Sequence, residues 1–121
     1  MEMSMREFVD FCNDRGYLTA QAHPFREASY IDHVRLFTNC ECVETFNACR
    51  DKSCNDLASY YCDAYGKTGI GGSDIHRFGQ QTLSGMEFDE PAESIEDLIS
   101  LIRSGKGKIL RRRNVLATIN P

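Results

Sequence analysis

The sequence predicts an α/β fold in which mostly parallel strands alternate with helices. Segments with a helical apolar period and short extended segments follow one another along the whole chain. Strands separated by helices pair in parallel, because the helix carries the chain back to the starting edge of the sheet. The 121 residues, 41% hydrophobic and 26% charged, are typical of one soluble globular domain spanning residues 1–121.

The first helix is predicted by its cap and by its apolar period. Ser4 and Glu7 have the spacing of a capping box, and Gly16 is placed to end the helix in a left-handed conformation. A short strand over residues 17–22 should follow the helix, and Pro24 should mark its end. The apolar face of this helix consists of Met5, Phe8, Val9 and Cys12.

The middle of the chain predicts two more helices and two more strands. Residues 30–37 have a weaker helical period, carried by Ile31, Val34 and Phe37. Residues 40–46 alternate as a strand does. Residues 55–65 predict a helix that Gly66 ends, and residues 68–73 the next strand.

The last third predicts an extended piece over residues 82–88 and a loop around Pro91. Ser94 should cap a final helix, with acidic residues in its first turn, and Gly105 should end it. Residues 108–113 predict a terminal strand or arm. The buried stripe of the helix should be Ile95, Leu98, Ile99 and Ile102.

Charge and apolar patterning argue against two classes of partner. The net charge of −4 gives no reason to expect nucleic-acid binding, and we interpret the basic tail Arg111–Arg113 as a solvated end. No apolar run approaches the roughly 20 residues that span a bilayer, so no membrane partner is expected. The first ten residues lack the pattern of a signal peptide, which predicts a cytoplasmic protein.

The six cysteines are best interpreted as reduced, mostly buried thiols, since no export signal accompanies them. The alternative is a zinc site that uses Cys40 and Cys42. Their single-residue separation is shorter than the spacing of common zinc knuckles, so this alternative is less favoured.

Polar residues that suit metal ligation follow each predicted strand. Asp74 and His76 lie two residues apart after a glycine-rich run, so both project from one face of an extended backbone. His23 follows the first strand and Glu44 lies near the end of the second. Carboxyl ends of parallel strands meet at one edge, so these residues are candidate ligands for Zn²⁺, Mn²⁺ or Fe²⁺.

Each candidate ligand also has an ordinary structural interpretation. The Asp74–His76 pair suits a hydrogen-bonded turn, and His23 suits a capping or hydrogen-bonded histidine. Glu44 could be a solvated strand residue or an ion-pair partner. His33 stands beside an aspartate in a predicted helix, which favours a surface role.

Three segments in this order resemble the PHP (polymerase and histidinol phosphatase) family. They are Gln21-Ala22-His23-Pro24-Phe25-Arg26, Val43-Glu44-Thr45-Phe46-Asn47 and Gly71-Gly72-Ser73-Asp74-Ile75-His76. Residues 94–99 and 103–106 also resemble the end of that domain, so the resemblance runs from about residue 16 to residue 106.

The resemblance implies a partial (β/α) barrel of PHP type that holds divalent metal and hydrolyses phosphate esters. His23, Asp74 and His76 match ligand positions of the family, and Glu44 matches an acidic position and is a further candidate. Metal in such a site polarises the phosphoryl group and activates water. Arg26 is a candidate contact for the phosphate of a phosphorylated small molecule, an exposed arginine being the alternative.

The sequence also departs from the family pattern. That pattern opens with a His-x-His strand and further ligands, whereas this chain has three histidines and resembles only the C-terminal half of the domain. We therefore expect an incomplete site in the isolated chain, completed in a homo-oligomer or by a companion chain that carries the N-terminal half. The alternative is a non-catalytic binding or regulatory domain that pairs with another chain.

Overall fold

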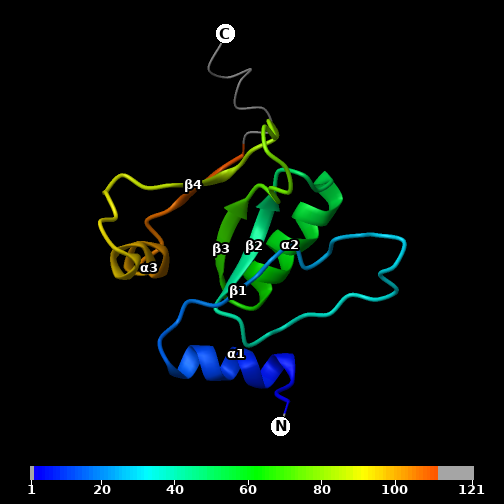
Figure 1. Ribbon diagram of the computed structural model, residues 1–121, viewed down its shortest axis with the longest axis horizontal. Coiled ribbons are helices and arrows are strands. Elements are labelled where there is room, and N and C mark those ends of the chain that lie inside the picture. The colour runs from blue at the N-terminus through cyan, green and yellow to red at the C-terminus, as the bar shows by residue number, and fades with distance from the viewer. Residues whose placement is uncertain (1, 112–121) are drawn as a thin grey trace.

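The computed structural model describes residues 2–111, which contain three helices and five strands (Figure 1). Parallel strands β1, β2 and β3 form one sheet, and an antiparallel ribbon of β4 and β5 continues beyond β3. The elements are α1 (Met5–Asp14), β1 (Ala20–Gln21), β2 (Cys42–Asn47), α2 (Lys52–Ala64), β3 (Thr68–Gly72), β4 (Gly85–Glu87), α3 (Ile95–Arg103) and β5 (Lys108–Leu110).

The prediction of a mixed fold with parallel strands is confirmed for the first sheet. Its order is β1-β2-β3, with Ala20 opposite Cys42 and Cys42 opposite Thr68. The pairing of β2 with β3 shifts register between Glu44 and Phe46. The described strands do not close into a barrel, so the partial barrel of PHP type is not confirmed.

The core lies between α2 and the middle strand β2. Val43 is fully buried and packs with Ala58, Tyr61 and Cys62 of α2, while the ring of Phe25 meets Tyr61 edge-on at 6.2 Å. The helix begins three residues earlier than predicted, at Lys52, and ends before a glycine with φ of +64°. Because β2 is buried on both faces, it positions the residues at its carboxyl end rigidly.

Helix α1 is attached by hydrogen bonds more than by apolar packing. The predicted capping box forms, with a 3.1 Å bond from the Glu7 N–H to the hydroxyl of Ser4. The Asn39 amide then donates to Arg6 O and to the Asp10 carboxylate, both at 2.9 Å. Of the predicted apolar face only Val9 is buried; the exposed fractions of Met5 and Phe8 are 55% and 51%.

Helix α3 confirms the Ser94 cap but corrects the predicted stripe. The Ser94 hydroxyl accepts a hydrogen bond from the Asp97 N–H at 3.1 Å. Ile95 is 68% exposed, and Leu101, outside the predicted stripe, is the buried residue of the helix. At the C-terminal end of α3, Arg103 binds the carboxylate of Glu41, the residue just before β2 (Figure 1). The first turn of α3 is exposed to solvent.

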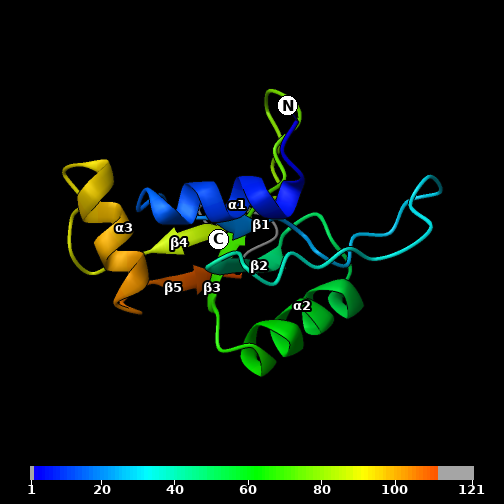
Figure 2. The ribbon, with the colours of Figure 1, turned by 90° about the horizontal axis from the view of Figure 1, so that it is seen from below.

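Two other predictions are corrected in the segment between β1 and β2. Residues 30–37 form a turn, a bend and irregular backbone instead of a helix, in the long loop that projects from the body in Figures 1 and 2. The Gln21 amide group donates to Arg35 O at 2.7 Å and accepts from the Phe37 N–H at 3.0 Å, which holds that backbone open. Strand β1 itself is limited to Ala20–Gln21.

The predicted terminal strand and the expected lack of a membrane-spanning segment can be compared with the structure only within residues 2–111. Of the predicted terminal strand, Lys108–Leu110 is confirmed as β5, while residues 112 and 113 lie outside residues 2–111. Within residues 2–111, no helix combines the length and apolar character that crossing a bilayer requires.

Candidate functional site

The candidate site lies at the carboxyl ends of the parallel strands, where the chain leaves β1, β2 and β3 in the same direction (Figure 1). His23 follows β1, Glu44 lies within β2, and Asp74 follows β3. The sequence prediction that these segments share one edge is therefore confirmed by the topology.

Glu44 joins the segment after β1 to the end of β2. Its Oε1 accepts a hydrogen bond from the backbone N–H of His23 at 2.9 Å and a second from the Asn47 amide at 2.9 Å. The two donors satisfy one carboxylate oxygen, which fixes its position at the sheet edge. Glu44 thus holds the His23 turn in place.

A glycine in β3 makes room for the Glu44 carboxylate. A Cβ atom placed on Gly72 would meet Glu44 Oε2 at 2.1 Å, so the carboxylate would have to move to make room for it. The glycine-rich run therefore allows a close approach, as its composition predicts. The group that approaches is a carboxylate of the neighbouring strand.

The Asp74 carboxylate contacts an arginine and a histidine. Its Oδ1 lies 3.0 Å from His76 Nδ1, and its Oδ2 lies 3.7 Å from Arg50 Nη2. The Asp74 side chain is 10% exposed, whereas that of His76 is 79% exposed. The Asp74 and His76 side chains therefore do converge. They do so in a hydrogen-bonded turn, which the sequence analysis gave as the alternative to a metal-ligand pair.

Backbone conformation adds a feature that periodicity could not reveal. His23 and Asp74 both have positive φ, +26° and +50°, a region that residues other than glycine adopt rarely. Such strain persists only where the surroundings fix it, and it concentrates at functional sites. Here the Glu44 carboxylate fixes the first turn, and the contacts of the Asp74 carboxylate with Arg50 and His76 fix the second.

Buried amides complete the edge, and the sequence analysis missed them. The Asn47 N–H donates to Asn55 Oδ1 at 3.0 Å, Asn55 Nδ2 donates back to Asn47 O at 3.2 Å, and Asn47 Oδ1 accepts from the Cys49 N–H. Gln80 Nε2 binds Ser73 O at 2.9 Å and closes the loop after β3. The one available signal was an asparagine at the end of a strand, a common turn former.

The six cysteines are free thiols, and four of them are buried, as the sequence predicts for most of them. Burial, followed by the neighbouring Glu41 carboxylate, raises the pKa of the Cys42 thiol from its ordinary 9.0 to about 11. Burial also raises the pKa values of Cys40 and Cys62. Among the described residues, no third His, Cys, Asp or Glu side chain is grouped with Cys40 and Cys42 to hold a metal, so the alternative zinc site gains no support.

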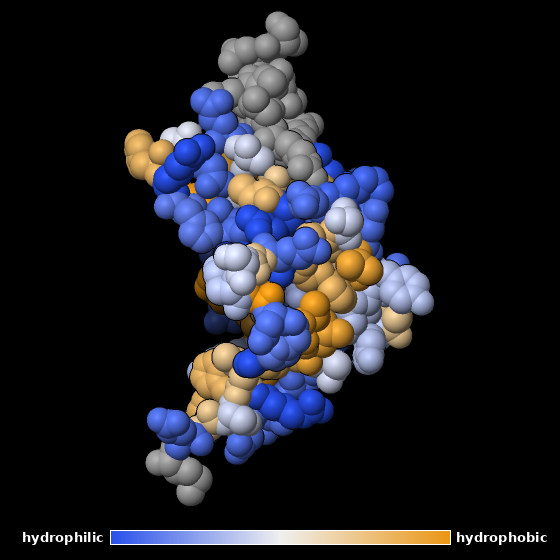
Figure 3. Space-filling view, turned by 90° about the vertical axis from the view of Figure 1, so that its right-hand side faces the viewer, coloured by the Kyte–Doolittle hydropathy of each residue, from blue (hydrophilic) through white to orange (hydrophobic). Residues whose placement is uncertain are grey.

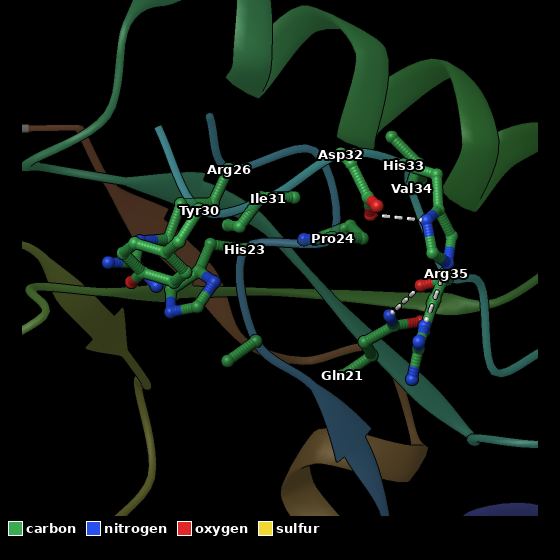
Figure 4. Close-up of a pocket in the computed structure, with 11 residues that line it drawn as sticks. Gln21, His23, Pro24, Arg26, Tyr30, Ile31, Asp32, His33, Val34 and Arg35 are labelled. Carbon is green, nitrogen blue, oxygen red and sulfur yellow. Dashed lines mark hydrogen bonds and ion pairs between the residues drawn. The ribbon is translucent and has the colours of Figure 1, made fainter. Parts of the chain in front are cut away.

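The side chain of His23 lies in a different place from Asp74 and His76. Its imidazole lines a pocket formed by the loop after β1, together with Arg26 and Tyr30 (Figure 4). Within residues 2–111, no hydrogen bond or ion pair joins this imidazole to Asp74 or His76. His33 has the surface role predicted for it, 2.5 Å from the Asp32 carboxylate, although it lies in a loop.

The donors at the sheet edge do not fit a metal ion as they are arranged. Glu44 Oε1 is bound by two protein N–H groups, and the Asp74 carboxylate faces an arginine and a histidine. In the part of the chain that the structure describes, no three His, Cys, Asp or Glu side chains are grouped to hold a metal. In this arrangement the carboxylates of Glu44 and Asp74 hold the loops that follow β1 and β3.

The fold and the site define a small α/β unit with polar residues at the carboxyl edge of a parallel sheet. Comparison with known families adds one assignment: residues 52–106, from α2 to the end of α3, match the PHP-associated family. The match confirms the predicted resemblance to the C-terminal region of PHP proteins over these residues. No curated protein and no solved structure matches the chain.

Proposed function

We propose that this chain is a non-catalytic PHP-derived binding domain that pairs with another chain through the open edge of its parallel sheet. The observation that carries the proposal is the engagement of Glu44 and Asp74 by protein donors. Carboxylates already bound by N–H groups, an arginine and a histidine serve as structural anchors. This favours the binding alternative over a complete hydrolase.

The open edge belongs to β1, which pairs with β2 on one side and with no other described strand. Thr19 O accepts a hydrogen bond from the Cys42 N–H at 2.9 Å, so the N–H of Ala20, opposite in the same planar peptide, points away from β2. Free edge groups of this kind recruit further strands.

An apolar groove of about 460 Å³ lies beside this edge. Its walls come from α1 and from the segment leading into β1, including Phe8 and Tyr17, which are both more than half exposed. An exposed apolar groove next to an unpaired strand suits a partner that brings a strand with apolar side chains. A second copy of this chain can supply its own β1 across a two-fold axis, and we take it as the partner.

Sedimentation velocity of the purified chain tests this pairing. We expect a dimer for the parent chain and a monomer for Ala20→Pro, because proline removes the outward N–H without touching the hydrogen bonds to β2. Phe8→Gln should weaken the dimer, whereas Tyr60→Gln, an exposed residue of α2, should leave it unchanged. A parent chain that sediments as a monomer at all concentrations would contradict the proposal.

A second candidate function is the phosphoesterase segment implied by the PHP resemblance. It is favoured by the family match and by the shared sheet edge of His23, Glu44 and Asp74. This function requires the carboxylates to exchange their present partners when the missing half of the domain binds. Turnover of p-nitrophenyl phosphate with added Mn²⁺ or Zn²⁺ that is lost in Asp74→Ala and His76→Ala would support the phosphoesterase function and contradict the non-catalytic binding domain.

A further inference from the structure

The open edge of β1 and the apolar groove beside it have a candidate occupant within this chain, in the residues that follow Arg111. The groove has a volume of about 460 Å³ and is lined mainly by α1 and residues 17–22, with Phe8 and Tyr17 more than half exposed. Figure 3, in which α1 lies at the bottom, shows apolar surface exposed above that helix. Apolar surface beside unpaired backbone groups suits an added strand.

Residues 112–121 include a short segment with the composition of a strand. Residues 115–119, Val-Leu-Ala-Thr-Ile, contain four apolar residues in five, and three of the five are β-branched. Alternate side chains of an extended segment lie on one face, so Val115, Ala117 and Ile119 would form a continuous apolar face. An asparagine flanks the segment on each side.

Arg111 brings the chain to the strand next to β1. Its guanidinium lies over the ring of Phe46, 5.3 Å from the centroid, near the end of β2. Cys42, which pairs with Ala20, precedes Phe46 by four residues on the same strand. With strands about 4.8 Å apart and a rise of about 3.3 Å per residue, the outer side of β1 at Ala20 lies roughly 16 Å from this point. About five extended residues cover that distance, so residues 115–119 reach the groove.

The direction of approach favours antiparallel pairing. A segment that arrives from the carboxyl end of β2 runs toward the amino end of β1, against the direction of β1 itself. The outward N–H of Ala20 is a donor for the backbone of that segment. Because only residues 112–114 tether the segment, its effective concentration at the edge is on the order of millimolar, which favours it over a second copy in dilute solution.

We infer that residues 115–119 pair with β1 of the same chain, cover the groove with Val115, Ala117 and Ile119, and so compete with a second copy for this edge. The inference rests on the pairing proposed above and adds its regulation. A second copy gains the edge only when the segment leaves it. If the edge is free in about one chain in ten, both copies must open, and the apparent dissociation constant of the dimer rises roughly hundredfold.

NMR spectroscopy of the full chain tests the docking of residues 115–119. We expect nuclear Overhauser contacts from the methyl groups of Val115 and Ile119 to the ring of Phe8. In a mixture of labelled and unlabelled chains, isotope-filtered spectra should assign these contacts to one chain and not to two copies.

Hydrogen exchange of the amides of residues 17–22 is measured at concentrations where the chain sediments as a monomer. Exchange should be slow at Ala20 in the parent chain. Ile119→Asp should speed it roughly tenfold or more, because a carboxylate in an apolar groove loses its hydration. Asn120→Asp is the matched control: it adds the same charge just outside the apolar segment and should leave the exchange unchanged.

Sedimentation velocity separates this inference from the pairing itself. Ile119→Asp should dimerise roughly tenfold or more tightly than the parent chain, because its edge is free, whereas Asn120→Asp should match the parent. If all three proteins stay monomeric while the contacts of Ile119 persist in the parent, the pairing is contradicted and the docking of residues 115–119 is retained.

Three results would overturn the inference. The first is a parent chain without the Ile119 contacts, in which Ala20 exchanges as fast as in Ile119→Asp; dimers of that chain would leave the pairing standing. The second is contacts that occur only between labelled and unlabelled copies. The third is equal dimerisation of Ile119→Asp and Asn120→Asp, which would show that the segment and the second copy do not compete.

Discussion

The backbone N–H of His23 donates a 2.9 Å hydrogen bond to the carboxylate of Glu44 and so fastens the chain leaving β1 to the middle strand. Asn47 binds the same oxygen, and a Cβ on Gly72 would collide with the other. Three successive strands therefore meet around one carboxylate. The stability of the candidate site depends on this carboxylate, which makes it the natural target for mutation.

Glu44→Ala should lower the free energy of unfolding by about 1 to 3 kcal/mol, because it leaves the His23 N–H and the Asn47 amide without their acceptor. Glu44→Gln keeps one acceptor oxygen and should cost less. Urea denaturation measures both. The control is Glu27→Ala, an exposed residue that should stay within about 0.5 kcal/mol of the parent. Equal effects at positions 44 and 27 would refute the anchoring role.

Gly72→Ala should displace the Glu44 side chain, since the new methyl group would lie 2.1 Å from Oε2. We expect a loss of about 1 to 3 kcal/mol and a shifted amide resonance for His23. Gly85→Ala is the matched control, because nothing lies within 4 Å of its added Cβ. An unchanged His23 resonance in Gly72→Ala would show that the carboxylate does not occupy this space.

Stability should fall as the pH rises through the alkaline range. Because the pKa of Cys42 is about 11 in the folded chain and 9.0 ordinarily, the unfolded chain loses this proton first. The contribution is fully present below pH 9 and is lost between about pH 9 and pH 11, at up to ~1.4 kcal/mol per pH unit. Urea midpoints across this range measure it. Cys42→Ala should flatten the slope, and an unchanged slope would contradict the assignment.

Arg103→Ala should loosen α3 from the body. The guanidinium donates to both oxygens of the Glu41 carboxylate, at 2.8 and 3.0 Å, and to Gly16 O at 3.3 Å. Both side chains are partly solvated, so we expect only a small loss of stability. Amide hydrogen exchange in residues 95–103 should accelerate. Lys106→Ala, which breaks a more exposed pair with Glu90, serves as control; equal acceleration there would argue against the docking role.

Elements with strong local signals could be predicted from the sequence. The Ser4 capping box, the Ser94 cap and the ends of helices at Gly16, Gly66 and Gly105 depend on residues within a few positions of one another. These glycines all adopt positive φ. The parallel pairing of β2 with β3 followed from the predicted helix between them, whereas β1 pairs in parallel with β2 although a long loop takes the place of the predicted helix.

Features set by distant contacts could not be predicted. The spacing of Ile31, Val34 and Phe37 suggested a helix, but the Gln21 side chain, far away in sequence, binds that backbone in an open form. The candidate ligands were placed at the correct edge, yet their partners came from residues without a motif, such as Asn47 and Arg50. The spacing of residues in the sequence indicates which face of a strand or helix a side chain lies on. It does not identify the residues that the side chain contacts in the fold.

Metal content tests most directly the claim that the carboxylates at the sheet edge are structural anchors. The purified chain would be incubated with Zn²⁺ or Mn²⁺, dialysed and analysed for bound metal, with Asp74→Ala and His76→Ala in parallel. We predict well below one ion per chain in all three proteins and no hydrolysis of p-nitrophenyl phosphate. One or more ions per parent chain, absent from both variants and accompanied by turnover, would contradict the account.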